Sequence, residues 1–194
     1  MILMKKRYYQ IRKTINQLFI TIYTAINRFQ FASWGAKSRI EFSAKLSAPY
    51  LISVGSKVRI CEHAWLNAKD DRGDSKPTLI IGDGTYIGRF VHINAWQQVV
   101  IENNVLIADR VYISDADHHF ENPGSPISVQ DDYFKGTVRL KEGCWLGIGV
   151  VVFPGITIGK NSIVGANSVV TQDVPDYTIV AGIPAKIIKK LATN

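Results

Sequence analysis

The chain has 194 residues, of which 46% are hydrophobic, 10% aromatic and 20% charged. This composition excludes a disordered chain and a collagen-like repeat, and the length predicts one domain with a substantial core. The two cysteines, Cys61 and Cys144, lie far apart in sequence, which excludes a disulfide scaffold and fits a protein with reduced thiols.

Positive charge is concentrated near the N-terminus. The chain has 23 Lys and Arg against 16 Asp and Glu, and the first acidic residue is Glu41. The cations that precede it are Lys5, Lys6, Arg7, Arg12, Lys13, Arg28, Lys37 and Arg39. The other 15 basic residues nearly balance the 16 acidic ones, so the body of the chain lacks a nucleic-acid-binding surface. We expect no nucleic-acid partner.

The first predicted element is an amphipathic helix over about residues 5–29. Its apolar stripe consists of Ile11, Ile15, Leu18, Ile22, Ile26 and Phe29. The apolar stretch is much shorter than the ~20 residues of a membrane span, and no clear signal-peptide cleavage site follows it. We therefore expect an unprocessed, cytoplasmic chain.

Two interpretations of this helix remain open. The stripe either docks on the main domain or a neighbouring subunit, or it lies on an anionic membrane surface with the help of the basic cluster. We favour docking, because apolar stripes most often are packing faces.

From Ile40 onward an aliphatic residue recurs every six positions. These positions are Val54, Ile60 and Leu66; Ile81, Ile87 and Ile93; Ile101, Ile107 and Ile113; and Leu140, Leu146, Val152, Ile158, Val164 and Val170. A β-sandwich would show two-residue alternation and irregular turns, so the repeat favours a parallel β-helix.

Each hexad can form one short strand and one corner, so three hexads should close a triangular coil with the aliphatic residues stacked inside. Compact residues four positions further on, such as Val58, Ala64, Val111 and Cys144, should share this core. Cys144 is therefore not expected to act as a nucleophile.

The repeat is interrupted three times, each time after the third hexad of a set. Steps longer than six residues separate Leu66 from Ile81, Ile93 from Ile101 and Ile113 from Leu140. The three insertions should therefore leave from one corner and lie side by side, where a rigid scaffold would carry its site. The longest, 115–137, is the candidate catalytic loop.

This loop contains His118 and His119, two of the four histidines. A histidine can accept a hydroxyl proton near neutral pH, and Asp115, Asp117 or Glu121 could orient it; a solvated polar turn is the alternative. Asn94 should lie directly beside Ser114, at the root of the loop. A zinc site is disfavoured because the histidines are not spaced as converging ligands.

The chain from about Ile40 to Lys190 resembles the hexapeptide-repeat acyltransferases, the left-handed β-helix group that includes galactoside, maltose and serine acetyltransferases. The resemblance is strongest in GCWLG at 143–147, PGITIG at 154–159, VGANSVVT at 164–171 and VAGIPAK at 180–186. It implies an all-β solenoid, with residues 1–39 forming the helix and linker and residues 40–190 the catalytic domain.

The resemblance also implies a homotrimer with each active site in a groove between neighbouring subunits. It assigns His118 as the catalytic base, and Asn94, Asp117 and His119 to the acceptor. It assigns acetyl-CoA binding to Trp145, Gly147, Ile148, Ala166, Thr171, Lys186 and Lys189, with no metal. Ala116 and Gln172 depart from the pattern, where a histidine and a basic residue are common.

We predict a direct attack of a sugar hydroxyl on acetyl-CoA, with His118 as base and a backbone N–H near Gly147 or Ile148 meeting the oxyanion. The basic helix suits surface-polysaccharide synthesis, for which a lipid-linked acceptor is one alternative. The alternatives are N-acetylation of an aminosugar and a non-catalytic scaffold.

Overall fold

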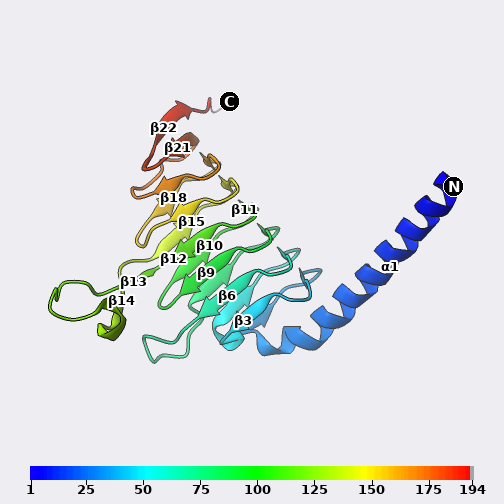
Figure 1. The fold of residues 1–194 in the computed structure, drawn as a ribbon, viewed down its shortest axis with the longest axis horizontal. Helices are drawn as coiled ribbons and strands as arrows, with labels where there is room; N and C mark the ends of the chain where they lie inside the picture. The colour runs from blue at the N-terminus through cyan, green and yellow to red at the C-terminus, as the bar shows by residue number, and fades with distance from the viewer. Residues whose placement is uncertain (193–194) are drawn as a thin grey trace.

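The computed structural model describes residues 1–192, which form a long N-terminal helix followed by three parallel β-sheets (Figure 1). Helix α1 spans Ile2–Asn27 and continues into a single 3-10 turn, η1 (Arg28–Gln30). Successive strands then visit the three sheets in turn, so that three strands complete one coil. Each strand pairs in parallel with its counterpart in the next coil, as the six-residue repeat predicts.

The three sheets contain strands of two to six residues. The first sheet consists of β1 (Ser33–Trp34), β4 (Ile52–Val54), β7 (Leu79–Ile81), β10 (Val99–Ile101), β15 (Val138–Leu140) and β18 (Thr157–Ile158). The second consists of β2 (Arg39–Ile40), β5 (Arg59–Ile60), β8 (Tyr86–Ile87), β11 (Leu106–Ile107), β16 (Trp145–Leu146), β19 (Ile163–Val164) and β21 (Thr178–Gly182), to which β22 (Ala185–Lys190) adds in antiparallel direction. The third consists of β3 (Lys45–Ser47), β6 (Trp65–Ala68), β9 (His92–Ala95), β12 (Tyr112–Ser114), β17 (Val151–Val152) and β20 (Val169–Val170). A short 3-10 turn, η2 (Pro49–Leu51), precedes β4.

The core is a column of aliphatic side chains inside the coils. Ile87 pairs with Ile60 on one side and Ile107 on the other, and all three are fully buried. The compact residues four positions further on are buried too, including Val111 and Cys144, which confirms their predicted place in the core. Stacking equivalent side chains removes apolar surface from water, which is the main source of stability for such a repeat.

Sharp corners join the strands. Gly149, between β16 and β17, has φ +70, and a Cβ there would clash with the side-chain oxygen of Asn167 in the next coil. Glycine is therefore favoured at this corner, although the equivalent corner one coil earlier holds Arg110 at φ 60.

All three insertions leave the third sheet and return to the first, after β6, β9 and β12, as predicted. The longest contains the antiparallel hairpin of β13 (Ala116–His118) and β14 (Asp132–Phe134), with the 3-10 turn η3 (Ile127–Val129) between them. This hairpin reaches away from the coils, on the opposite side from α1 (Figure 1).

The preferred interpretation offered two docking surfaces for the helix, and the chain's own domain does not cover the apolar stripe. Docking on a neighbouring subunit stays a prediction. The helix projects from the first coil, and only its C-terminal part makes a buried contact, where the Thr24 hydroxyl accepts a hydrogen bond from Ile40 N–H at 3.1 Å (Figure 1). The apolar stripe stays exposed, because the side chains that meet the domain belong to the opposite face of the helix. Within residues 1–192, no helix combines the length and apolarity that crossing a bilayer requires.

Candidate active site

A small pocket of about 90 Å³ lies where the 115–137 loop leaves the third sheet. Strands β9 and β12 provide its floor, and the β13–β14 hairpin provides one wall. Its lining residues are Asn94, Trp96, Tyr112, Ser114, Ala116, Asp117, His118 and Asp132. The pocket thus joins two predicted insertions, since Trp96 belongs to the short one and His118 to the long one.

His118 and Asp132 are direct partners across the hairpin. The imidazole Nδ1 contacts the Asp132 carboxylate, and the His118 side chain is 67% exposed. A carboxylate at Nδ1 fixes the ring orientation and favours the tautomer in which Nε2 can accept a proton. The geometry is that of a general base with an orienting acid, open to a substrate.

The predicted orienting acids have other roles. Asp117 binds Lys135 Nζ at 3.0 Å, and Glu121 lies 3.0 Å from Nδ1 of His119 rather than His118. The sequence analysis missed Asp132, because the hairpin that brings it back across the loop has no periodic signal.

Asp115 is fully buried and binds the backbone of the neighbouring insertion. Its carboxylate accepts hydrogen bonds from the backbone N–H groups of Trp96, Gln97 and Gln98 at 2.7 to 3.1 Å. Charge-assisted bonds of this kind are among the stronger ones in proteins, so Asp115 ties the two insertions together beneath the pocket.

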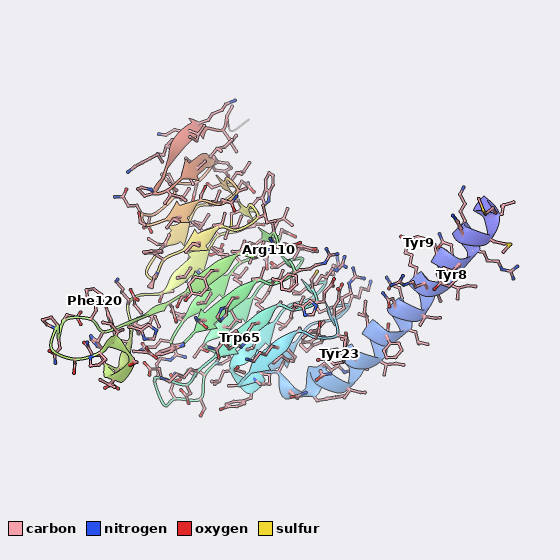
Figure 2. The ribbon with its side chains drawn as sticks, in the orientation of Figure 1. Tyr8, Tyr9, Tyr23, Trp65, Arg110 and Phe120 are labelled. Atoms are coloured by element: carbon pink, nitrogen blue, oxygen red, sulfur yellow. The ribbon has the colours of Figure 1, made fainter. Side chains whose placement is uncertain are left out.

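Asn94 lies beside Ser114 in the paired strands β9 and β12, as predicted. Its amide donates a hydrogen bond to the Tyr112 hydroxyl at 3.2 Å and accepts one from Asn67 at 2.9 Å. The neighbouring His92 stacks on Trp65 with ring centroids 4.2 Å apart, and burial lowers its pKa. This row of side chains on the third sheet holds Asn94 in place; Trp65 is visible on it in Figure 2.

The residues assigned to acetyl-CoA lie elsewhere on the coils. Trp145, in β16, is 44% exposed, and Gly147, Ile148 and Ala166 follow at the corner between the second and third sheets. A Cβ on Gly147 would lie 2.7 Å from the Ala166 backbone nitrogen, so glycine is favoured where the two coils pack this closely. Among the hydrogen bonds found within residues 1–192, none is donated by the Ile148 N–H, which leaves it available to an oxyanion.

The remaining assigned residues lie towards the C-terminal coils. Thr171 directly follows β20, and Lys186 and Lys189 belong to β22. Lys186 lines a pocket of about 270 Å³ together with Gln172 and Asp173. Gln172, which stands where the family commonly has a basic residue, thus lines the same pocket as Lys186.

Within one chain these two groups do not form a single site. His118 extends from the corner between the third and first sheets, whereas Trp145, Gly147, Ile148 and Ala166 lie at or before the corner between the second and third. In the part of the chain that the structure describes, no group of three or more His, Cys, Asp or Glu side chains is arranged to hold a metal ion.

Comparison with known proteins finds chains with the same repeat and the same fold. Residues 137–172 match the family model "Bacterial transferase hexapeptide (six repeats)". A putative lipopolysaccharide biosynthesis O-acetyl transferase, WbbJ of Escherichia coli, is 38% identical over 118 residues, covering 58% of this chain and 60% of that protein. The chain thus spans less than two thirds of the length of the first curated relatives it matches.

Two solved structures share the fold over most of the chain. A variant of AntD, an N-acyltransferase from Bacillus cereus in complex with dTDP-4-amino-4,6-dideoxyglucose and coenzyme A, is 26% identical with a TM-score of 0.72, covering 88% of this chain and 89% of that one. A galactoside acetyltransferase in complex with coenzyme A is 25% identical with a TM-score of 0.61, covering 87% and 69%. The resemblance drawn from the repeat is confirmed: residues 137–172 match the hexapeptide transferase model, and the chain is similar to acyltransferases of this group.

Proposed function

We propose that the protein transfers the acetyl group of acetyl-CoA to a hydroxyl group of a sugar, in the synthesis of a surface polysaccharide. The observation that carries the proposal is the His118–Asp132 pair, which places an oriented, exposed imidazole in a polar pocket at the root of the long loop. The relatives named as sugar O-acetyltransferases support the reaction class.

In this mechanism Nε2 of His118 accepts the proton of the acceptor hydroxyl as its oxygen attacks the thioester carbonyl. The Ile148 N–H donates to the oxygen that becomes negative, and protonated His118 returns the proton to the departing sulfur. Asn94 and Asp117 hold sugar hydroxyls beside His118. Cys144 takes no part, because burial raises the pKa of its thiol to about 12.

We further propose that the coils wind left-handed and that the protein is a homotrimer. The separation of the two groups of site residues supports the homotrimer, because a neighbouring subunit would have to bring the corner that carries Trp145 and Ile148 up to His118. The left-handed winding rests on the resemblance to the hexapeptide-repeat acyltransferases alone. A crevice shared by two copies would then hold both substrates.

N-acylation of an aminosugar is the second candidate, which the similarity to AntD favours. An amine attacks without a base once it is neutral, whereas a hydroxyl needs its proton removed. The two reactions therefore differ in how strongly they depend on His118.

The test measures CoA release from acetyl-CoA with matched pairs of acceptors, each sugar offered in its hydroxyl and its amino form. We expect turnover with a hydroxyl acceptor, and a loss of about 10²- to 10⁴-fold in His118→Ala. Lys57→Ala is the control, because it changes an exposed side chain at the corner between the first and second sheets, away from His118 and from the corner that carries Ile148. Equal rates for wild type and His118→Ala would overturn the catalytic assignment, and turnover with amino sugars alone would favour N-acylation.

A non-catalytic scaffold makes a different prediction. It would show no increase in melting temperature with CoA, whereas a protein that binds CoA in its native state is stabilised by it.

A further inference from the structure

The apolar stripe of α1 is exposed along the length of the helix. Ile11, Ile15, Leu18, Ile22 and Ile26 are each at least half exposed. The side chains that meet the β-domain belong to the opposite face: Thr24 is buried, and Ile20, Tyr23 and Asn27 are partly buried. The domain therefore covers the face of the helix opposite the stripe and leaves the stripe itself uncovered.

The helix also reaches well beyond the coils. Its 26 residues span about 40 Å, and Tyr8 and Tyr9 lie near its free end while Tyr23 lies beside the first coil (Figure 2). A flat apolar surface could contact the whole stripe without meeting the β-domain first.

The charge of the helix indicates which kind of partner covers its apolar stripe. Six cations and no anion lie on the helix and the turn after it, five of them between Lys5 and Lys13. A second copy of the chain would offer these cations a β-domain with nearly balanced charge, 15 basic against 16 acidic residues beyond Arg39. A bilayer rich in anionic lipid offers a continuous negative surface together with an apolar layer beneath it.

We propose that α1 lies in the plane of an anionic lipid bilayer, with the stripe from Ile11 to Ile26 in the headgroup and acyl boundary and Lys5, Lys6 and Arg7 at the lipid phosphates. This inference is independent of the proposed acetyl transfer, because it concerns a segment remote from the His118 pocket. It departs from the preference for docking: the chain's own domain does not cover the stripe, and a stripe covered by a neighbouring subunit is the alternative that the test below separates.

Vesicle flotation of the full chain tests the proposal. We expect binding to phosphatidylcholine vesicles that contain about one third phosphatidylglycerol, weak binding to phosphatidylcholine alone, and release by salt. The double variant Lys5→Gln with Lys6→Gln should lose about fivefold in partitioning per cation, about 25-fold for the pair. Lys57→Gln with Arg110→Gln removes the same charge from exposed corners of the coils and should bind as wild type does.

A site-specific probe separates lipid from a second copy. Cys61 and Cys144 are buried, so an environment-sensitive dye can be attached to a single introduced cysteine. The emission of the dye at Leu18→Cys should shift to the blue on addition of anionic vesicles, and that at Gln17→Cys, off the stripe, should not. A dye at Leu18→Cys that is already shifted in buffer and insensitive to vesicles would show a protein-covered stripe and overturn the proposal. Equal binding to neutral and anionic vesicles would overturn it as well.

Discussion

His118 and Asp132 face each other because β13 and β14 pair in antiparallel register, with the whole tip of the loop between them. The base and its orienting acid therefore belong to one hairpin rather than to the coils. Any change in the register of that hairpin separates them, since a shift by one residue turns every side chain to the other face.

Asp132→Asn should lower kcat by at least about tenfold and leave KM nearly unchanged, because the amide can no longer hold the imidazole as a charged acceptor does. Steady-state kinetics with a saturating sugar acceptor measures this. Asp131→Asn is the control, because Asp131 is exposed and contributes its backbone carbonyl, not its side chain, to the loop. A similar loss in both variants would mean that the hairpin is merely disturbed.

Asp115→Asn should lower the free energy of unfolding by about 2 kcal/mol, because a buried acceptor that holds three backbone N–H groups loses its charge. Denaturant unfolding measures the change. Activity should fall too, as Trp96 moves in the wall of the pocket. An unchanged midpoint of unfolding would show that Asp115 does not tie the two insertions.

The adjacent residues Ile80 and Ile81 offer a test of the coil itself. Ile81 is 1% exposed and Ile80 is 37% exposed in the same strand, β7. Ile81→Ala should cost about 2–5 kcal/mol, because it leaves a cavity in the stacked core, and Ile80→Ala should cost well under half of that. Denaturant unfolding at one protein concentration measures both losses in the free energy of unfolding. Equal losses would contradict the prediction that the aliphatic residue of each hexad points into the core.

The six-residue period predicted the coil, the core positions such as Ile81 and Val111, and the common corner of the insertions, because each follows from a strict repeat. It could not predict how α1 meets the domain, since a stripe of isoleucines looks the same whether it is covered or exposed. The partner of His118 was missed for a related reason. The hairpin that pairs Asp132 with His118 depends on its own strand register, which the six-residue repeat does not determine. Three other carboxylates are closer to His118 in sequence, so spacing did not single out Asp132.

The Cys144 thiol should resist alkylation in the native protein at pH 9, because burial raises its pKa from 9.0 to about 12. The same shift makes stability depend on pH. The folded state favours the neutral thiol, so its contribution is complete below about pH 9 and is lost as the pH rises towards about 12. Cys144→Ala should flatten this part of the stability profile, which chemical unfolding across that range would measure. Rapid modification of Cys144 at pH 9 without unfolding would contradict the buried placement.

Mixing two inactive variants tests whether the active site is shared. If His118 of one subunit meets Ile148 and Trp145 of a neighbour, His118→Ala and Trp145→Ala subunits complement each other. A site is intact when its first subunit carries only the Trp145 change and its neighbour only the His118 change. Random equimolar mixing by co-expression should therefore restore about one quarter of the wild-type sites, although each variant alone is impaired at every site.

The control mixes His118→Ala with Asp132→Asn. Both changes lie in the same hairpin, so each subunit's hairpin is defective and mixing should give only the average of the two variants. If the first mixture also shows only the average activity of its two variants, His118 and Trp145 do not meet across a subunit boundary, and the shared crevice is contradicted.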